Sequence, residues 1–457
     1  MIIGILILGL ILRLVNFNQS LWLDEAVQAI TSQGSFAGIF TELQGDFHPP
    51  LYHLLTWLWV HLFGSSEVVL RLPSVLFGIA TVFVVYKLMV HINRQSAIIV
   101  ALLMSTAPFH IYYSQEARMY AMTTFFAALS MYFFVRLISC QKKNNTRPLK
   151  IGYVLATVLL LYSDYFGLFV LLAQAIAAPF LILQFLCLLF FLPWLPMFLT
   201  QIQVGRQAIQ ALPEWGKLVN VNFTKALPLT FIKFSIGRIT IFNKKLYAVI
   251  AGVLFLAYGV IIARGFFQKR KLTIDKRQLT ILLWLVVPIL SAWLISIFIP
   301  NYQPFRLLLV LPAFYLLLSL GITRFSNSGL RQILIFFILA VNLISLAVFY
   351  TNPYFHREDW RGVVSYIEKQ EIANSVALLP SLSSHWPYTY YAKNKIPLAM
   401  GTSSQNLVDR NKIFYICYLV PLFDPDEKIS FWLTDNNFVK IKEVNFNQIP
   451  LWVYQKQ

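Results

Sequence analysis

Long apolar runs recur along this chain and constrain its fold more than any other feature. A membrane-spanning helix needs about 20 apolar residues in succession. Only 12% of the residues are charged, about half of what a soluble domain carries on its water-facing surface. We therefore predict an all-α polytopic membrane protein. The clearest candidate spans lie near residues 1–16, 69–91, 95–111, 119–139, 246–264, 279–299, 306–323 and 330–350.

The segment 151–200 is almost uncharged and is too long for two spans. We expect three helices here, with breaks near 162–166 and near Pro179, which brings the total to about eleven spans. The first apolar run lacks the basic start and the small-residue cleavage site of a signal peptide. We therefore interpret it as an uncleaved span.

Lys and Arg gather in short loops, and these loops predict the orientation of the chain. In an eleven-span count the three most basic loops fall on one side, which the positive-inside rule makes cytoplasmic. The net charge of +18 is thus assigned to membrane topology and not to nucleic acid. The first loop, 16–70, and the C-terminus then lie on the extracytoplasmic face. The basic loops are Gln141–Lys150, Arg264–Arg277 and Arg324–Arg331.

The chain changes character after residue 350, where charged residues, Asn and Ser become frequent. We predict a transmembrane domain over 1–350 and a small extracytoplasmic α/β domain over 351–457. Its role is either a structural cap or substrate recognition. The expected elements are a helix over Trp360–Lys369 and strands over Ser375–Leu379, Lys412–Leu419 and Pro450–Tyr454.

Acidic residues are scarce, and several of them fall in the first outer loop. Asp24 and Glu25 directly follow the apolar triplet LWL at the mouth of the first helix. Carboxylates near lipid are costly unless they pair or take part in chemistry. The pair is therefore a candidate site, although acidic residues that merely solvate a loop would give the same pattern.

Several short motifs occur in a fixed order along the chain: SLWLDEA (20–26), DFHPPLY (46–52), FGSSEVVLRLPS (63–74), YSQEARMYA (113–121), YSDYFG (162–167), PWLP (193–196) and FRLLLVLP (305–312). This order resembles the GT-C glycosyltransferases, in particular the dolichyl-phosphate-mannose protein mannosyltransferases and the bacterial aminoarabinose and related lipid-sugar transferases. The resemblance covers most of residues 10–350 and implies a membrane enzyme that transfers a sugar from a polyprenyl-phosphate carrier.

The resemblance implies a role for each member of the acidic pair. Asp24 matches the catalytic base that takes a proton from the incoming hydroxyl, and Glu25 would support or orient it. Two adjacent carboxylates raise the pKa of one of them, which suits a base. Direct displacement of the lipid phosphate would invert the anomeric carbon.

The leaving phosphate needs cations, and we expect Arg118, Arg306 and His48 to bind it. A guanidinium matches phosphate oxygens with two parallel hydrogen bonds. The alternative is that an Arg at a helix end only reaches toward lipid headgroups. His53 is expected to face the interface from an amphipathic helix over 51–63 that lies along the membrane surface.

Further polar residues on the same predicted face are candidates for a second acid or for the acceptor side. Glu116 is equally suited to pair with Arg118, and interfacial belts also explain the tyrosines. Relatives often carry a His where this chain has Asp164, and a basic residue shortly after the acidic pair, where this chain has Ala26–Gln28. The candidates are Glu116, Asp46, Tyr113, Tyr162 and Asp164.

No metal site is indicated, because the first loop has no DxD triplet and the cysteines have no Cys/His spacing. A divalent ion between Asp24 and Glu116 remains an alternative. The expected partners are a polyprenyl-phosphate sugar, membrane lipid and an acceptor that is a lipid, glycan or protein. The competing functions are a secondary transporter or lipid flippase, for which repeats and charged mid-span positions are not seen, and a noncatalytic scaffold.

Overall fold

The computed structural model describes residues 1–457 except 141–144, 269–270, 273–274, 371–373, 394–395 and 402–406. Parts of the predicted basic loops Gln141–Lys150 and Arg264–Arg277 therefore lie outside the described residues. The chain forms two compact units, which we call the helical unit and the mixed unit. The helical unit comprises Met1–Phe17, Phe36–Thr56 and Arg71–Thr351, and the mixed unit comprises Asn18–Ser35, Trp57–Leu70 and Asn352–Gln457. The simpler division at residue 350 stays a prediction.

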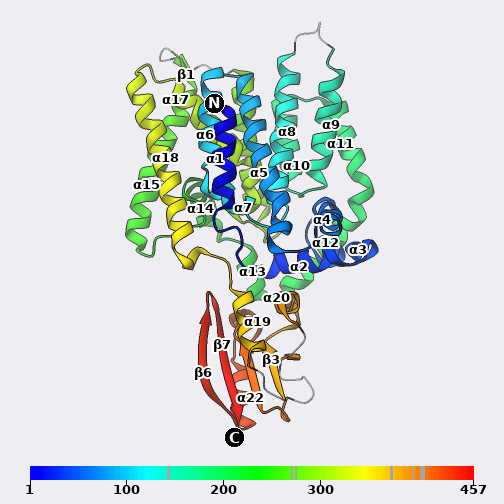
Figure 1. Ribbon diagram of the computed structural model, residues 1–457. Helices are drawn as coiled ribbons and strands as arrows, with labels where there is room; N and C mark the ends of the chain where they lie inside the picture. Colours follow the sequence, from blue (N-terminus) through cyan, green and yellow to red (C-terminus); the bar gives the residue numbers. More distant parts are fainter. Residues whose placement is uncertain (141–144, 269–270, 273–274, 371–373, 394–395, 402–406) are drawn as a thin grey trace. The chain divides into compact units, whose positions relative to one another are not determined.

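Helices make up nearly all of the helical unit, and two helices, α4 and α5, have residues in both units (Figure 1). The bounds in chain order are α1 (Ile2–Leu14), α3 (Phe36–Gly45), α4 (Leu51–Phe63), α5 (Glu67–Val90), α6 (Arg94–Ser105), α7 (Pro108–Ser114), α8 (Tyr120–Ser139), α9 (Arg147–Leu161), α10 (Gly167–Ala177), α11 (Leu181–Phe191), η1 (Leu192–Trp194), α12 (Leu195–Ala211), α13 (Pro213–Val219), α14 (Phe223–Ile236), α15 (Lys244–Gly265), β1 (Phe267–Gln268), β2 (Lys271–Leu272), α16 (Lys276–Ile295), η2 (Pro304–Val310), α17 (Leu311–Thr323) and α18 (Ser328–Thr351).

The predicted polytopic helical architecture is confirmed. Within the described residues, 7 helices are long and apolar enough to cross a membrane, or 8 if α6 and α7, bent by 57°, form one span. α1, α4 and α10 are apolar but have only 10–17 residues each. The predicted count of about eleven spans is therefore not confirmed.

The predicted breaks near 162–166 and Pro179 are confirmed, because they separate α9, α10 and α11. Of the three predicted spans, only the one that begins with α11 is long enough, among the residues that the structure describes, to cross a membrane. The first break is tight, because a Cβ on Gly167 would lie 2.8 Å from Leu160 Cγ. At the second break Ala178 is extended, as expected for the residue before Pro179. α11 then continues through η1 into α12, so that Leu181–Ala211 forms one apolar helical stretch.

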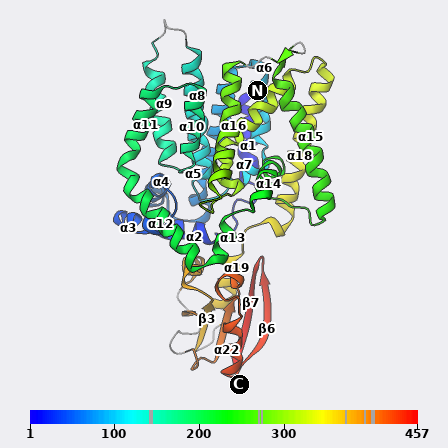
Figure 2. The ribbon, with the colours of Figure 1, turned by 180° about the vertical axis from the view of Figure 1, so that it is seen from behind.

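The centre of the helical unit is the segment Pro304–Thr323, which comprises η2 and α17. Its apolar stretch of 18 residues is 89% buried. α6, α15 and α16 all pack against α17. α15 and α17 approach so closely that a Cβ on Gly321 would overlap the carbonyl oxygen of Ile261. On the other side of the unit, α9 packs between α8 and α11 (Figure 2).

The mixed unit contains a five-stranded sheet of order β4-β3-β5-β7-β6. β3 pairs in parallel with β4 and β5, whereas β7 is antiparallel to β5 and β6. The small C-terminal α/β domain is thus confirmed. The bounds are α2 (Leu23–Gln33), η3 (Pro353–Phe355), α19 (Trp360–Glu368), β3 (Ser375–Leu379), η4 (Leu382–Ser384), α20 (Trp386–Tyr391), β4 (Leu398–Met400), β5 (Lys412–Ile416), α21 (Val420–Phe423), α22 (Lys428–Asp435), β6 (Phe438–Phe446) and β7 (Ile449–Lys456).

Both faces of this sheet are covered, which explains the apolar runs of its central strands. Phe414 of β5 belongs to a core that includes Trp360 of α19, and Tyr415 belongs to a second core with Leu433 of α22. Leu23, the first residue of α2, packs against the core that contains Trp360. The helix that carries the acidic pair is therefore anchored to the C-terminal sheet.

Candidate functional site

A short turn between α3 and α4 places a carboxylate and two imidazoles together in the helical unit. Pro49 and Pro50 restrict the backbone after His48 and lead into α4, whose first N–H donates to the Tyr162 carbonyl at 3.0 Å. The Asp46 carboxylate accepts hydrogen bonds from the Phe47 N–H at 2.6 Å and from His48 Nδ1 at 2.8 Å.

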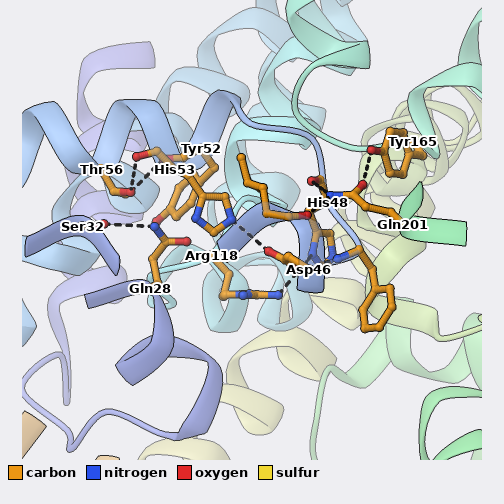
Figure 3. A network of polar contacts seen from close by, with 12 residues as sticks. Gln28, Ser32, Asp46, His48, Tyr52, His53, Thr56, Arg118, Tyr165 and Gln201 are labelled. Carbon is orange, nitrogen blue, oxygen red and sulfur yellow. Dashed lines mark hydrogen bonds and ion pairs between the residues drawn. The ribbon is translucent and has the colours of Figure 1, made fainter. Parts of the chain in front are cut away.

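The second oxygen of Asp46 lies 2.9 Å from His53 Nε2 (Figure 3). The expectation that His53 faces the interface is therefore wrong, because its side chain is buried and points to Asp46. Burial of an imidazole is costly unless it is hydrogen-bonded, and the carboxylate supplies that bond. The predicted helix over 51–63 itself is confirmed as α4.

Electrostatics favours an ionised Asp46 beside a neutral His48. Burial opposes the charge on Asp46, but His48, His53 and Arg118 together hold its pKa well below its usual range. Burial also lowers the pKa of His48, and the charges of Arg118 and Arg306 lower it further, against the influence of Asp46. A neutral His48 donates its Nδ1 proton to Asp46.

The opposite nitrogen of His48 is thereby left as a lone-pair acceptor. His48 Nε2 is buried and has no hydrogen-bond partner among the residues that the structure describes. Arg118 NH2 lies 3.5 Å from Nδ1, at the limit of hydrogen-bond distance. In this tautomer His48 gives an incoming ligand an acceptor, and it becomes a donor only after it takes up a proton.

Three more predicted residues, Arg118, Asp164 and Arg306, belong to the same region. Asp164 lies in the turn before α10, where its carboxylate accepts the Phe166 N–H at 2.9 Å. Burial raises its pKa, and the charges of His48, Arg306 and Arg118 act in the opposite direction. These interactions define one polar cluster. The term polar cluster below means Asp46, His48, His53, Arg118, Asp164 and Arg306.

The sequence did not point to Gln201, which supports the backbone of the turn. Its Nε2 donates to the carbonyls of Leu43 at 2.6 Å and His48 at 3.2 Å. Its Oε1 accepts from the Tyr165 hydroxyl, which also accepts from Trp194 Nε1 at 2.9 Å (Figure 3). A buried amide inside the apolar stretch Leu181–Ala211 was the available signal.

Tyr113, Glu116 and Tyr162 have other environments. The Tyr113 hydroxyl accepts a hydrogen bond from Arg238 NH1 at 3.3 Å, and Glu116 is close enough to interact electrostatically with Arg238. Tyr162 donates to the Phe190 carbonyl at 3.0 Å. Arg238 was not predicted, because nothing in its local sequence distinguishes it from other basic residues near helix ends.

The acidic pair of the first outer loop lies in the mixed unit. Asp24 and Glu25 occupy the first turn of α2, where the helix dipole favours negative charge. Glu25 is fully buried, and its Oε2 lies 3.7 Å from Arg357 Nε of the C-terminal domain. Burial of this carboxylate beside a buried guanidinium makes a solvated loop a poor explanation for Glu25.

A third carboxylate of the mixed unit was missed from the sequence. Glu358 accepts hydrogen bonds from Trp360 Nε1 at 3.0 Å and from the Tyr418 hydroxyl at 3.1 Å. Burial raises the pKa of Glu358 to about 7, with a further contribution from the charge of Asp24. Only the folded domain brings this residue near α2.

The described residues contain no group of three or more His, Cys, Asp and Glu side chains arranged to hold a metal ion. In the Asp46 turn, both carboxylate oxygens are engaged by imidazoles. The alternative of an ion between Asp24 and Glu116, which belong to different units, stays a prediction.

Comparison with known proteins identifies the architecture. Residues 47–204 match the family model described as dolichyl-phosphate-mannose-protein mannosyltransferase. The crystal structure of ArnT from Cupriavidus metallidurans bound to undecaprenyl phosphate superposes with a TM-score of 0.55 at 13% identity, over 99% of this chain and 97% of that chain. The chain has the GT-C fold. No curated protein matches it in sequence.

The GT-C fold is also supported by a second solved structure. The oligosaccharyltransferase of Archaeoglobus fulgidus, tethered with an acceptor peptide, matches with a TM-score of 0.52 at 12% identity. That match covers 88% of this chain and 64% of the other. The predicted resemblance to GT-C proteins is thus confirmed for the fold, and the chain is an integral membrane protein.

Proposed function

We propose that this chain transfers a sugar from a polyprenyl-phosphate carrier to a lipid, glycan or protein acceptor, with inversion at the anomeric carbon. The GT-C fold and the family match over 47–204 support a membrane glycosyltransferase. The ArnT structure contains undecaprenyl phosphate, which supports a lipid-phosphate donor here as well. The distribution of basic loops supports an extracytoplasmic active site and C-terminal domain.

The observation that carries this proposal is the charge arrangement of the polar cluster. The phosphodiester of such a donor bears one negative charge, and the released polyprenyl phosphate gains a second. Arg118 and Arg306, set beside a neutral imidazole, suit the stabilisation of this developing charge. The same two guanidinium groups lower the pKa of His48, so a bound anion raises it. His48 then takes up a proton and donates Nε2–H to the leaving phosphate.

Each remaining member of the polar cluster has a supporting role in this scheme. Asp46 fixes the His48 tautomer through the 2.8 Å contact to Nδ1. Burial raises the pKa of Asp164, which weakens its opposition to an incoming phosphate. Tyr113, Glu116 and Tyr162 remain candidates for the acceptor side.

Asp24 is proposed as the general base, with Glu25 as its supporting carboxylate. Asp24 takes the proton from the acceptor hydroxyl while the oxygen attacks the anomeric carbon and the bond to phosphate breaks. One displacement of this kind inverts the configuration and needs no covalent enzyme intermediate. The burial of Glu25 beside Arg357 supports a structural contribution from the second carboxylate.

The proposal is tested with purified full-length protein and a panel of undecaprenyl-phosphate sugars. A bound donor should raise the melting temperature, and slow release of undecaprenyl phosphate should follow by mass spectrometry. Arg306→Ala should reduce the thermal shift. Arg94→Ala is the matched control, since this exposed Arg also lies in the first turn of a helix but is outside the polar cluster.

The outcomes separate the candidate functions. Equal stabilisation of Arg306→Ala and the wild type would refute the phosphate assignment. Stabilisation without any release, together with movement of the lipid across a bilayer, would replace the transferase by a flippase. No stabilisation by any member of the panel would favour a noncatalytic scaffold.

A further inference from the structure

Within the mixed unit, the C-terminal domain holds the segment that leads into α2 at several points. The Arg357 N–H donates to Gln19 Oε1 at 2.8 Å, and the Arg361 N–H donates to Ser20 Oγ at 3.0 Å. The Leu21 N–H donates to the Tyr391 hydroxyl at 2.8 Å. Three consecutive residues before α2 are thus bonded to the domain.

A second set of contacts continues this attachment on the other segment of the first loop. Arg361 NH2 donates to Glu67 Oε1 at 2.8 Å, and the Tyr391 hydroxyl donates to the same oxygen at 3.0 Å. The Tyr390 hydroxyl donates to the Ser65 carbonyl at 2.6 Å. This density of specific bonds exceeds what a loosely attached cap requires.

The attachment brings one charged dipeptide of the domain to the acidic pair. Arg357 lies 3.7 Å from Glu25, and Glu358 is close enough to Asp24 for their charges to interact. Trp360 and Tyr418 each donate a hydrogen bond to Glu358 and fix its two oxygens. Arg357 and Glu358 therefore face neighbouring members of the pair.

We infer that the C-terminal domain is a working part of the catalytic centre, in which Arg357 orients Glu25 and Glu358 is a positioning residue for the base Asp24. This inference rests on the proposed function and deepens it, because it names a second carboxylate on which the base depends. Glu358 is not assigned any contact with the reacting atoms.

The physical reason is the excess of negative charge around one guanidinium. Glu25 lies 3.7 Å from Arg357, and Glu358 interacts with the charges of both Asp24 and Arg357. Like charges that are close oppose simultaneous ionisation. Protonation of Glu358 removes this repulsion, whereas ionisation of Glu358 adds a negative charge that favours proton transfer from the acceptor hydroxyl to Asp24. Other charged or titratable groups on the elements packed here are His356, Asp359, Arg361, Tyr366, Glu368, Glu67, Tyr388, Tyr390, Tyr391 and Tyr418.

The coupling can be measured without a donor. Infrared difference spectra of the full chain between pH 6 and pH 8 should contain the carbonyl band of a protonated carboxyl with a midpoint near 7, since the pKa of Glu358 is about 7. Glu358→Gln should remove that band. Asp24→Asn should lower its midpoint by roughly one pH unit, because a neighbouring negative charge is lost.

The matched control is Glu443→Gln, which removes an exposed glutamate of β6 in the same domain and should leave band and midpoint unchanged. An unchanged midpoint in Asp24→Asn, or a band that persists in Glu358→Gln, would overturn the inference.

A second readout follows turnover with undecaprenyl-phosphate mannose and water as acceptor. The wild-type rate should rise between about pH 6 and pH 8, and Glu358→Gln should lose that rise while Glu443→Gln keeps it. If Asp24→Asn keeps full turnover, the proposed base is wrong. If Asp24→Asn loses turnover but Glu358→Gln keeps the wild-type pH profile, only the positioning role of Glu358 is refuted.

Discussion

Removal of the Asp46 carboxylate should destabilise the turn between α3 and α4. Asp46→Ala leaves the imidazoles of His48 and His53 without the acceptor that each has at 2.8 and 2.9 Å. A buried polar group without a partner costs about 1–3 kcal/mol. Because 17% of the Asp46 side chain is exposed, we expect the lower part of the combined range, about 2–4 kcal/mol.

Asp46→Asn should lie between the wild type and Asp46→Ala. The amide oxygen still accepts from one partner, whereas the NH₂ group opposes the other imidazole unless that ring changes its tautomer. The expected loss is therefore about half of that for alanine, roughly 1–2 kcal/mol. The pair of variants separates the contribution of hydrogen bonding from that of charge.

The pH dependence of the stability lost in Asp46→Ala follows from the direction in which the pKa of Asp46 is shifted. The pKa of Asp46 in the folded protein is well below its usual value, so its contribution is present above about pH 3.9 and disappears as pH falls further. The difference between wild type and Asp46→Ala should thus persist from pH 7 to about pH 5 and narrow below about pH 4.

The assay is thermal unfolding of the purified protein in detergent across this pH range. Asp426→Asn serves as the control, since that carboxylate is 69% exposed in its pair with Lys428 and should change stability little. An Asp46→Ala variant as stable as the wild type from pH 5 to 7 would refute the assignment of Asp46 as the acceptor that holds both imidazoles.

Three further outcomes are expected. Asp24→Asn should lower the rate of sugar transfer by roughly a hundredfold or more, yet keep the rise in melting temperature that the donor causes. Product release and thermal unfolding are measured on the same preparation. Arg306→Ala should weaken donor binding by roughly 1.5–3 kcal/mol, measured by donor titration, with little change in the melting temperature of the free protein. Gly321→Ala should cost about 1–3 kcal/mol in thermal unfolding because its Cβ would overlap the Ile261 carbonyl, whereas Gly252→Ala, where nothing lies within 4 Å, should not destabilise α15.

Local patterns in the sequence were sufficient for the architecture. The apolar runs predicted a polytopic helical protein, and the breaks near 162–166 and Pro179 were placed correctly. At Pro179 the reason is local, because proline favours an extended backbone for the residue before it. The strand over Ser375–Leu379 and the helix from Trp360 followed from periodicity, which is also local. The number of spans did not follow, because helix length depends on packing that composition does not show.

The partners of the charged residues were harder to predict from the sequence than the helices. The amphipathic pattern of α4 predicted that His53 faces the membrane interface. His53 is instead buried, because it forms a hydrogen bond with Asp46, seven residues earlier. Glu116 was a candidate for a second acid or for a pair with Arg118, and the fold also brings it near Arg238, more than a hundred residues away. Electrostatic partners that are distant in sequence were therefore not found.

The sequence by itself determined that this chain lives in a membrane, where its helices break, and that its motifs resemble those of GT-C proteins, because each of these is a property of neighbouring residues. Only the tertiary structure decided that Asp46 holds both His48 and His53, that Glu25 lies beside Arg357 and that Glu358 interacts with the charge of Asp24. The reason is physical: the pKa of a buried charge depends on distance in space, which the order of residues does not encode.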